Sequence, residues 1–161
     1  MSGRKHSSKR KSAESGVTTV EGAIILIAFF MLLFGVIEAG QFMKARQVLT
    51  NAAREGARFA VAPTSGTNTL PGESEVVAKV NSFLAAANVT GATTTTKCPI
   101  SASEACTSKN SSMSVTTGFV TTEYTEVTVS KPYSVITAPG LFSAISVNLQ
   151  GRALMRRETS E

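Results

Sequence analysis

A glycine, a valine and a glutamate at fixed spacing are the residues of this chain most able to do chemistry. Gly16 ends a basic leader, Val17 follows it, and Glu21 interrupts an apolar stretch five positions after Gly16. A cut after Gly16 would create a free ammonium on Val17, one helical turn from Glu21. An ionised carboxylate in a bilayer is costly unless paired, so Glu21 is a candidate functional residue whose partner is that ammonium, on the same or a neighbouring copy. A position of Glu21 among lipid headgroups, without such a role, remains the alternative.

Catalytic constellations are missing from the sequence. The single histidine, His6, lies in the leader, and the chain contains no aspartate, no Gly-rich phosphate loop and no metal-ligand spacing. We therefore expect neither an enzyme nor a bound metal or other cofactor. Glu73 with Glu75 and Glu123 with Glu126 are carboxylate pairs by sequence, and we expect both pairs on solvated faces.

The elements that position Glu21 begin with residues 16–43, which are almost entirely apolar. Sixteen uncharged residues separate Glu21 from Glu38. With its flanks this stretch exceeds the ~20 residues that cross a bilayer as a helix. A buried helix of a soluble protein is the alternative, but the rest of the chain is rich in Thr, Ser and Ala and offers no comparable apolar element to pack against it. The run is also longer than the apolar core of a cleaved secretory signal.

Basic residues concentrate in the leader, which carries +4 of the net charge of +5. A basic segment before a spanning helix stays in the cytoplasm, so residues beyond about 43 are expected outside it. No basic patch or aromatic platform follows downstream, so we expect no nucleic-acid partner. Residues 1–15, charged and Ser-rich, are expected to be disordered.

Two cysteines, Cys98 and Cys106, lie in the part assigned to the outer side, where disulfides persist. They could form half of a metal site, but the chain supplies no second pair of ligands. A disulfide between them is the favoured interpretation.

The remaining pattern predicts an α+β fold. A long N-terminal helix over residues 17–62, its first half transmembrane, should end at Pro63 and pack on a small head. A second helix is expected over 73–88, with Glu75 and Lys79 paired. Runs of β-branched residues predict an antiparallel sheet of about four strands, with one face on the helices and one in water; these runs lie within 89–97, 114–120, 122–133 and 144–155. The expected parts are a leader (1–16), a transmembrane half-helix (17–43), an extramembrane half-helix (44–62) and a head (63–161).

Small residues four apart, Gly35 with Ala39 and Gly56 with Ala60, would allow another helix to approach the first one closely. The apolar connection over residues 133–142 is expected to form a short helix or a loop at the membrane surface.

Residues 15–61 closely resemble the N-terminal signature of TadE-like proteins, the pseudopilins of bacterial tight-adherence (Flp) pilus systems. The most specific part is 34–58, which joins FGVIEAG to NAAREGAR. The segments YTEVTVSKPYSV and AISVNLQGRALMRRE resemble the closing strands of the family more loosely, and residues 64–115 carry nothing diagnostic.

This resemblance implies a precursor that a prepilin peptidase of the bacterial inner membrane cuts between Gly16 and Val17, leaving Glu21 as the fifth mature residue. It further implies a minor or tip component that serves assembly of an adhesive pilus, with other pilins or pseudopilins and the assembly platform as partners. Gly22 stands where the family often has an aromatic residue, which puts peptidase recognition in question. Ile27 stands where it often has proline, which predicts a straighter helix.

A different function also fits the sequence. The chain could be a permanently anchored single-pass membrane protein whose external domain binds a partner, without processing or assembly. The first residue of the mature protein separates the two functions: Val17 in one, Met1 in the other.

Overall fold

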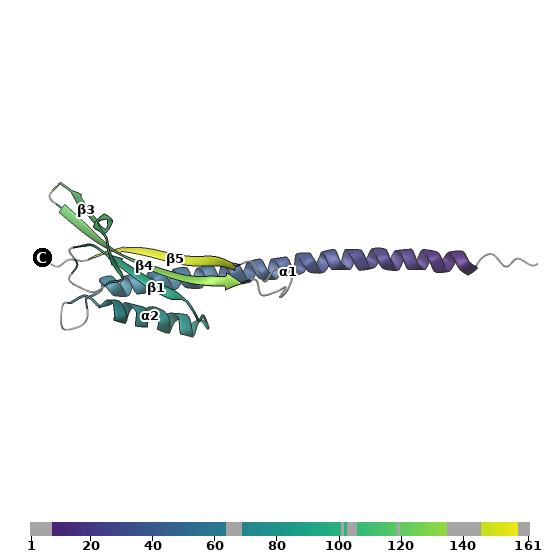
Figure 1. Ribbon diagram of the computed structural model, residues 1–161, viewed down its shortest axis with the longest axis horizontal. Coiled ribbons are helices and arrows are strands. Elements are labelled where there is room, and N and C mark those ends of the chain that lie inside the picture. The colour runs from purple at the N-terminus through teal and green to yellow at the C-terminus, as the bar shows by residue number, and fades with distance from the viewer. Residues whose placement is uncertain are drawn as a thin grey trace, which may run out of the picture.

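A long helix with a small head at one end makes up the protein (Figure 1). This computed structural model describes residues 8–63, 69–100, 102, 106–118, 120–134 and 146–157, and side chains from residue 16 onward. Helix α1 runs over Ser8–Val61 for 54 residues, about 80 Å at the usual rise. Its C-terminal part carries the sheet and helix α2 (Glu73–Ala86), and its N-terminal part projects beyond the head.

Helix α1 starts earlier than the sequence predicted. We expected residues 1–15 to be disordered and the helix to begin at Val17, but residues 8–15 are helical; residues 1–7 lie outside the described part. Between Ser8 and Val17 no proline interrupts the chain, and Gly16 costs a helix only about 1 kcal/mol. A helix already formed by the apolar stretch can therefore extend backwards through the leader. Its end at Val61, before Pro63, agrees with the prediction.

The projecting part of α1 is apolar and uncovered. Residues 16–37 are all exposed, including Ile24 and Leu32 at 63% and 67%. The helix is long and apolar enough to cross a membrane once, and no residue of its most apolar stretch is buried. A core helix of a soluble protein would be buried, so the soluble alternative does not fit this arrangement.

Small side chains let α1 approach the rest of the head. Leu49, Ala52, Ala53 and Ala57 are almost fully buried at the centre of the core. A side chain on Gly56 would come within 2.5 Å of Val80 on α2. The second predicted pair of small residues thus faces α2, whereas Gly35 and Ala39 of the first pair remain exposed.

Helix α2 has well-formed ends. The N–H of Gly72, the residue before the helix, donates to Glu75 Oε2 at 3.0 Å and so caps the N-terminus. At the C-terminus Asn88 takes a left-handed φ of 56°, and the N–H of Val89 donates back to the Leu84 carbonyl at 2.9 Å. The predicted pair of Glu75 with Lys79 does not form. Glu75 caps the helix instead, and Lys79 lies 3.7 Å from Glu55 on α1.

Five strands form the sheet: β1 (Thr93–Cys98), β2 (Ser108–Lys109), β3 (Ser114–Thr117), β4 (Val120–Ser134) and β5 (Ser146–Arg156). Their order in the sheet is β2-β1-β4-β3, and β5 also pairs with β4. A 3-10 turn, η1 (Ser111–Met113), precedes β3. The predicted strands are confirmed, but β2 was not predicted and pairs with β1 in parallel. A helix or loop at the membrane surface was expected over residues 133–142. Residues 133 and 134 instead end strand β4, and residues 135–142 lie outside the described part.

One face of the sheet covers the helices. Val127 and Val129 of β4 are fully buried, and Val127 is opposite Ala153 of β5. Gly151 of β5 lies so close to α1 that an added Cβ would overlap the backbone of Leu49 and Thr50. On the other face, Thr128 is half-buried and Gln150 and Arg152 are exposed. The predicted division into a covered and a solvated face is confirmed, with buried Glu126 as an exception.

Candidate processing and assembly site

The three residues singled out first in the sequence lie on one exposed stretch of α1. Gly16, Val17 and Glu21 are all exposed, and Val17 retains 68% of its surface. Because Val17 and Glu21 are four positions apart in a helix, their side chains lie one above the other on the same face. A cut after Gly16 would therefore leave the new ammonium within one turn of the carboxylate.

The peptide bond between Gly16 and Val17 lies inside the helix. A peptidase must unwind this turn to reach the carbonyl carbon, because helical amides are hydrogen-bonded along the axis. Glycine lowers the local helix stability by about 1 kcal/mol relative to alanine, which eases that unwinding. Added side-chain atoms at Gly16 would meet no other part of this chain within 4 Å. Packing within the described part of the chain therefore does not require glycine at this position.

The second membrane-proximal carboxylate, Glu38, is held by the head. Tyr133 Oη of β4 donates a hydrogen bond to Glu38 Oε1 at 2.5 Å. The Tyr133 ring also meets Phe42 edge to face, with ring centroids 5.6 Å apart. Removal from water, then the hydrogen bond and the charge of Glu38, raise the pKa of Tyr133 to about 12. The partner of Glu38 is thus a residue of the sheet, 95 positions later in the chain.

Glu126 departs most from its predicted place. It was expected on a solvated face, but its side chain is 3% exposed. The Arg152 guanidinium of β5 pairs with its Oε2, Lys97 Nζ of β1 lies 3.7 Å from Oε1, and Thr128 donates to Oε1 at 3.2 Å. The cations of two neighbouring strands thus cover one carboxylate of the central strand, and the expectation is wrong because their long side chains fold over it.

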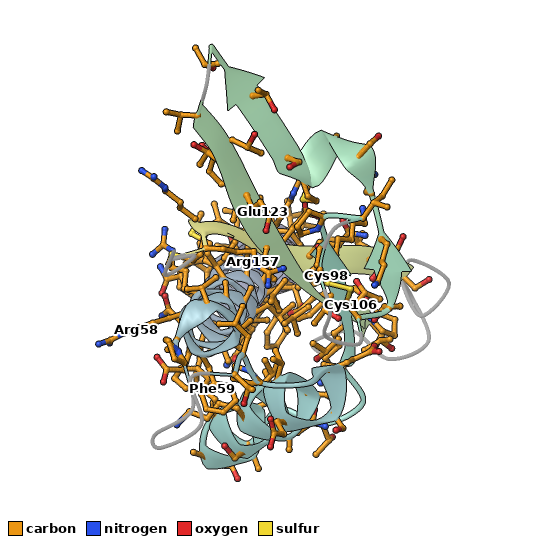
Figure 2. The ribbon with its side chains drawn as sticks, turned by 90° about the vertical axis from the view of Figure 1, so that its left-hand side faces the viewer. Arg58, Phe59, Cys98, Cys106, Glu123 and Arg157 are labelled. Carbon is orange, nitrogen blue, oxygen red and sulfur yellow. A yellow bond between two sulfur atoms is a disulfide. The ribbon has the colours of Figure 1, made fainter. Side chains whose placement is uncertain are left out.

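Glu123 is also engaged. Its Oε2 lies 3.8 Å from Nε of Arg157, a side chain that is 5% exposed, and the Arg157 N–H donates to the Glu123 carbonyl at 2.8 Å. Figure 2 shows the two side chains next to one another. These two contacts attach Arg157, the residue after β5, to strand β4. Glu73 likewise accepts a hydrogen bond from the Thr107 hydroxyl. Each of these carboxylates thus has a partner within the head.

Cys98 and Cys106 form a disulfide, with Cα atoms 6.4 Å apart (Figure 2). The favoured interpretation is confirmed. Because each sulfur is bonded to the other, neither is available as a metal thiolate. The bridge closes the loop between β1 and β2. Next to it, the Asn110 N–H donates to the Cys98 carbonyl at 2.8 Å and adds a backbone hydrogen bond between the two strand ends.

Sequence reasoning missed the contact of Glu38 with Tyr133 and the burial of Glu126. The two residues of the first contact are 95 positions apart, and no local periodicity links them. The only signal in the sequence was the position of each: a glutamate ending the apolar stretch and a tyrosine ending a strand.

The family model for TadE-like proteins matches residues 16–58. This range begins at Gly16 and contains Val17, Glu21 and Glu38. No curated protein and no solved structure matches the chain. The match supports a pilus-related protein of the minor-pilin class. Over residues 16–58, which include both the apolar stretch and its polar continuation, the resemblance of this chain to the TadE-like family is confirmed.

Proposed function

We propose that this chain is the precursor of a TadE-like pseudopilin or minor pilin that a prepilin peptidase cuts between Gly16 and Val17. The observation that carries the proposal is the family match, which begins at Gly16 and continues along α1. The leader would lie in the cytoplasm, α1 would cross the inner membrane, and the head would lie outside, in accord with the basic leader and the disulfide. The role is structural rather than enzymatic.

Assembly follows from the exposed surface of α1. Residues 16–37 have no cover from the head, and in a fibre this apolar surface would pack against the same helix of other pilins. Glu21 would pair with the Val17 ammonium of its own or a neighbouring subunit. In a low-dielectric bundle, loss of one member of such a pair leaves the other charge unpaired, which costs about 3–5 kcal/mol. The assembly platform and other pilins would be the partners.

The test of this role is Glu21→Ala in a strain that makes the pilus. Removing a carboxylate from a spanning helix removes an insertion cost of up to ~3 kcal/mol, so the variant should insert as well as wild type. We expect it to be expressed, inserted and cut, yet to leave the cells without pili. Thr19→Ala, also on the exposed part of α1, is the matched control and should support pili. Normal piliation by Glu21→Ala at native protein levels would refute the assembly role.

A further inference from the structure

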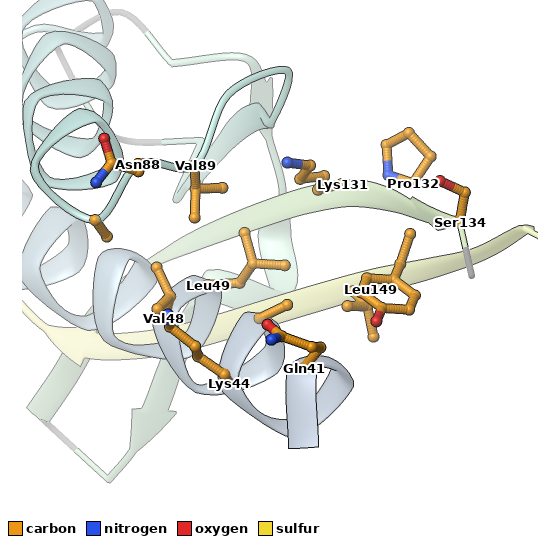
Figure 3. Close-up of a pocket in the computed structure, with 13 residues that line it drawn as sticks. Gln41, Lys44, Val48, Leu49, Asn88, Val89, Lys131, Pro132, Ser134 and Leu149 are labelled. Atoms are coloured by element: carbon orange, nitrogen blue, oxygen red, sulfur yellow. The ribbon is translucent and has the colours of Figure 1, made fainter. Parts of the chain in front are cut away.

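A groove of about 350 Å³ opens in the head at the end from which α1 projects (Figure 3). Its walls come from α1, the residues after α2, and the adjoining ends of β4 and β5. The inner surface is mostly apolar, with Val48 and Leu49 of α1, Val89 after α2, and Leu149 of β5. The volume is within the range of sites that hold small ligands, about 300–1,000 Å³.

Two lysines give the groove a positive charge. Lys44 of α1 and Lys131 of β4 line it, and none of its lining residues is acidic. Among the described residues, neither ammonium forms an ion pair with a carboxylate. Tyr133, also in the lining, directs its hydroxyl to Glu38 and so occupies the carboxylate that ends the apolar stretch. An apolar wall beside two ammonium groups is complementary to a molecule with an anionic group and an apolar body.

In a bilayer around α1, the groove would lie at the depth of lipid headgroups. The part of α1 expected to cross the bilayer, residues 17–43, ends one residue before Lys44. Lys44 would then lie where the hydrocarbon meets the headgroups. Since Gln41 and Lys44 both line the groove, its α1 wall continues directly from the surface that lipid would cover. The stem of a lysine at this place packs on apolar surface while its ammonium reaches the headgroups.

We propose that this groove binds an anionic phospholipid from the bilayer that surrounds α1. Lys44 and Lys131 would contact the phosphate, and Val48, Val89 and Leu149 would contact the glycerol and the first acyl carbons. Such binding would set the orientation of the head on the membrane. The proposal rests on α1 spanning a membrane. It requires neither a cut after Gly16 nor a partner for Glu21, so it can stand or fall separately from the proposed function.

The test uses the full chain in phosphatidylcholine nanodiscs that contain phosphatidylglycerol with a photoactivatable group near the glycerol. After illumination, mass spectrometry locates the labelled peptides. We expect label on residues 41–49 and 131–134. Lys44→Gln with Lys131→Gln should reduce that label by about tenfold, since each lysine near an anionic surface contributes several-fold in affinity.

The matched control is Arg46→Gln with Arg54→Gln. It removes the same charge from the same protein, but Arg46 and Arg54 line a different hollow of α1, so the label should persist. Circular dichroism checks that both double variants are folded. Three results would refute the proposal: equal labelling by a phosphatidylcholine probe of the same design, loss of label with soluble glycerol phosphate, or crosslinks from the groove to a second copy of the chain in place of lipid.

Discussion

Tyr133 Oη donates a hydrogen bond of 2.5 Å to Glu38 Oε1, and this contact joins the end of strand β4 to the helix at the point where α1 leaves the head. Phe42 packs on the same tyrosine ring. A polar and an aromatic contact thus attach the end of β4 to α1, in addition to the buried core that α1 shares with the head.

Tyr133→Phe should weaken this junction. The variant keeps the ring contact with Phe42 but removes the donor to Glu38. Because Tyr133 is half-buried and water can replace part of the bond, we expect a loss of about 1 kcal/mol in the free energy of unfolding. The thermal midpoint of the head, followed by circular dichroism in detergent, should fall by about 5 °C. Tyr124→Phe, at the only other tyrosine, should leave it almost unchanged.

Alkaline pH should act on the same contact. Folding favours the neutral phenol, since the pKa of Tyr133 is raised to about 12. Its contribution to stability is complete below the unfolded tyrosine pKa of about 10 and is lost as the pH rises through the folded value. Absorbance titration of the folded chain should show that the Tyr133 phenol ionises near pH 12. If Tyr133→Phe retains that step, the assignment is wrong.

Gly151→Ala tests the close approach of β5 to α1. A methyl group there would overlap the backbone of Leu49 and Thr50, which cannot rotate away as a side chain could. We expect a loss of at least about 2 kcal/mol in unfolding free energy, measured by denaturant titration of the full chain. Gly40→Ala is the control, because its Cβ would meet nothing within 4 Å. Equal stability of the two variants would contradict the described packing.

Reduction of the disulfide should destabilise the head without unfolding α1. Cys98 and Cys106 close a short loop, and the chain-entropy estimate for such a loop is about 2–3 kcal/mol. Mass analysis of protein from the native envelope, without reductant, should find both thiols blocked. Free thiols that react with an alkylating reagent at both positions would contradict the bridge.

The sequence predicted those parts of the fold that local patterns determine. An uninterrupted apolar stretch, the three- and four-residue spacing of Val76, Val80 and Leu84, and alternation in β4 and β5 each identify an element from its own residues. Contacts between distant residues were beyond this reasoning: Tyr133 with Glu38, Arg152 with Glu126, and the parallel pairing of β2 depend on how the elements meet. The helical part of the leader was missed because its charged, Ser-rich composition indicates only that it cannot bury a core. Composition does not show that the neighbouring helix can extend into it.

The proposed site was predicted to the extent that it is contained in one helix. Gly16, Val17 and Glu21 are related by spacing alone, and α1 places them as that spacing requires. Partners of Glu21 on other subunits cannot follow from one chain, because they depend on packing between copies.

The N-terminal residue of the mature protein, identified by mass spectrometry, tests the central claim most directly. Membrane protein from a bacterium with a working prepilin peptidase should begin at Val17. The Gly16→Asp variant should insert equally well, since insertion depends on charge and hydrophobicity, but should keep residues 1–16. A wild-type protein that begins at Met1 under the same conditions would contradict processing and would favour a permanently anchored protein.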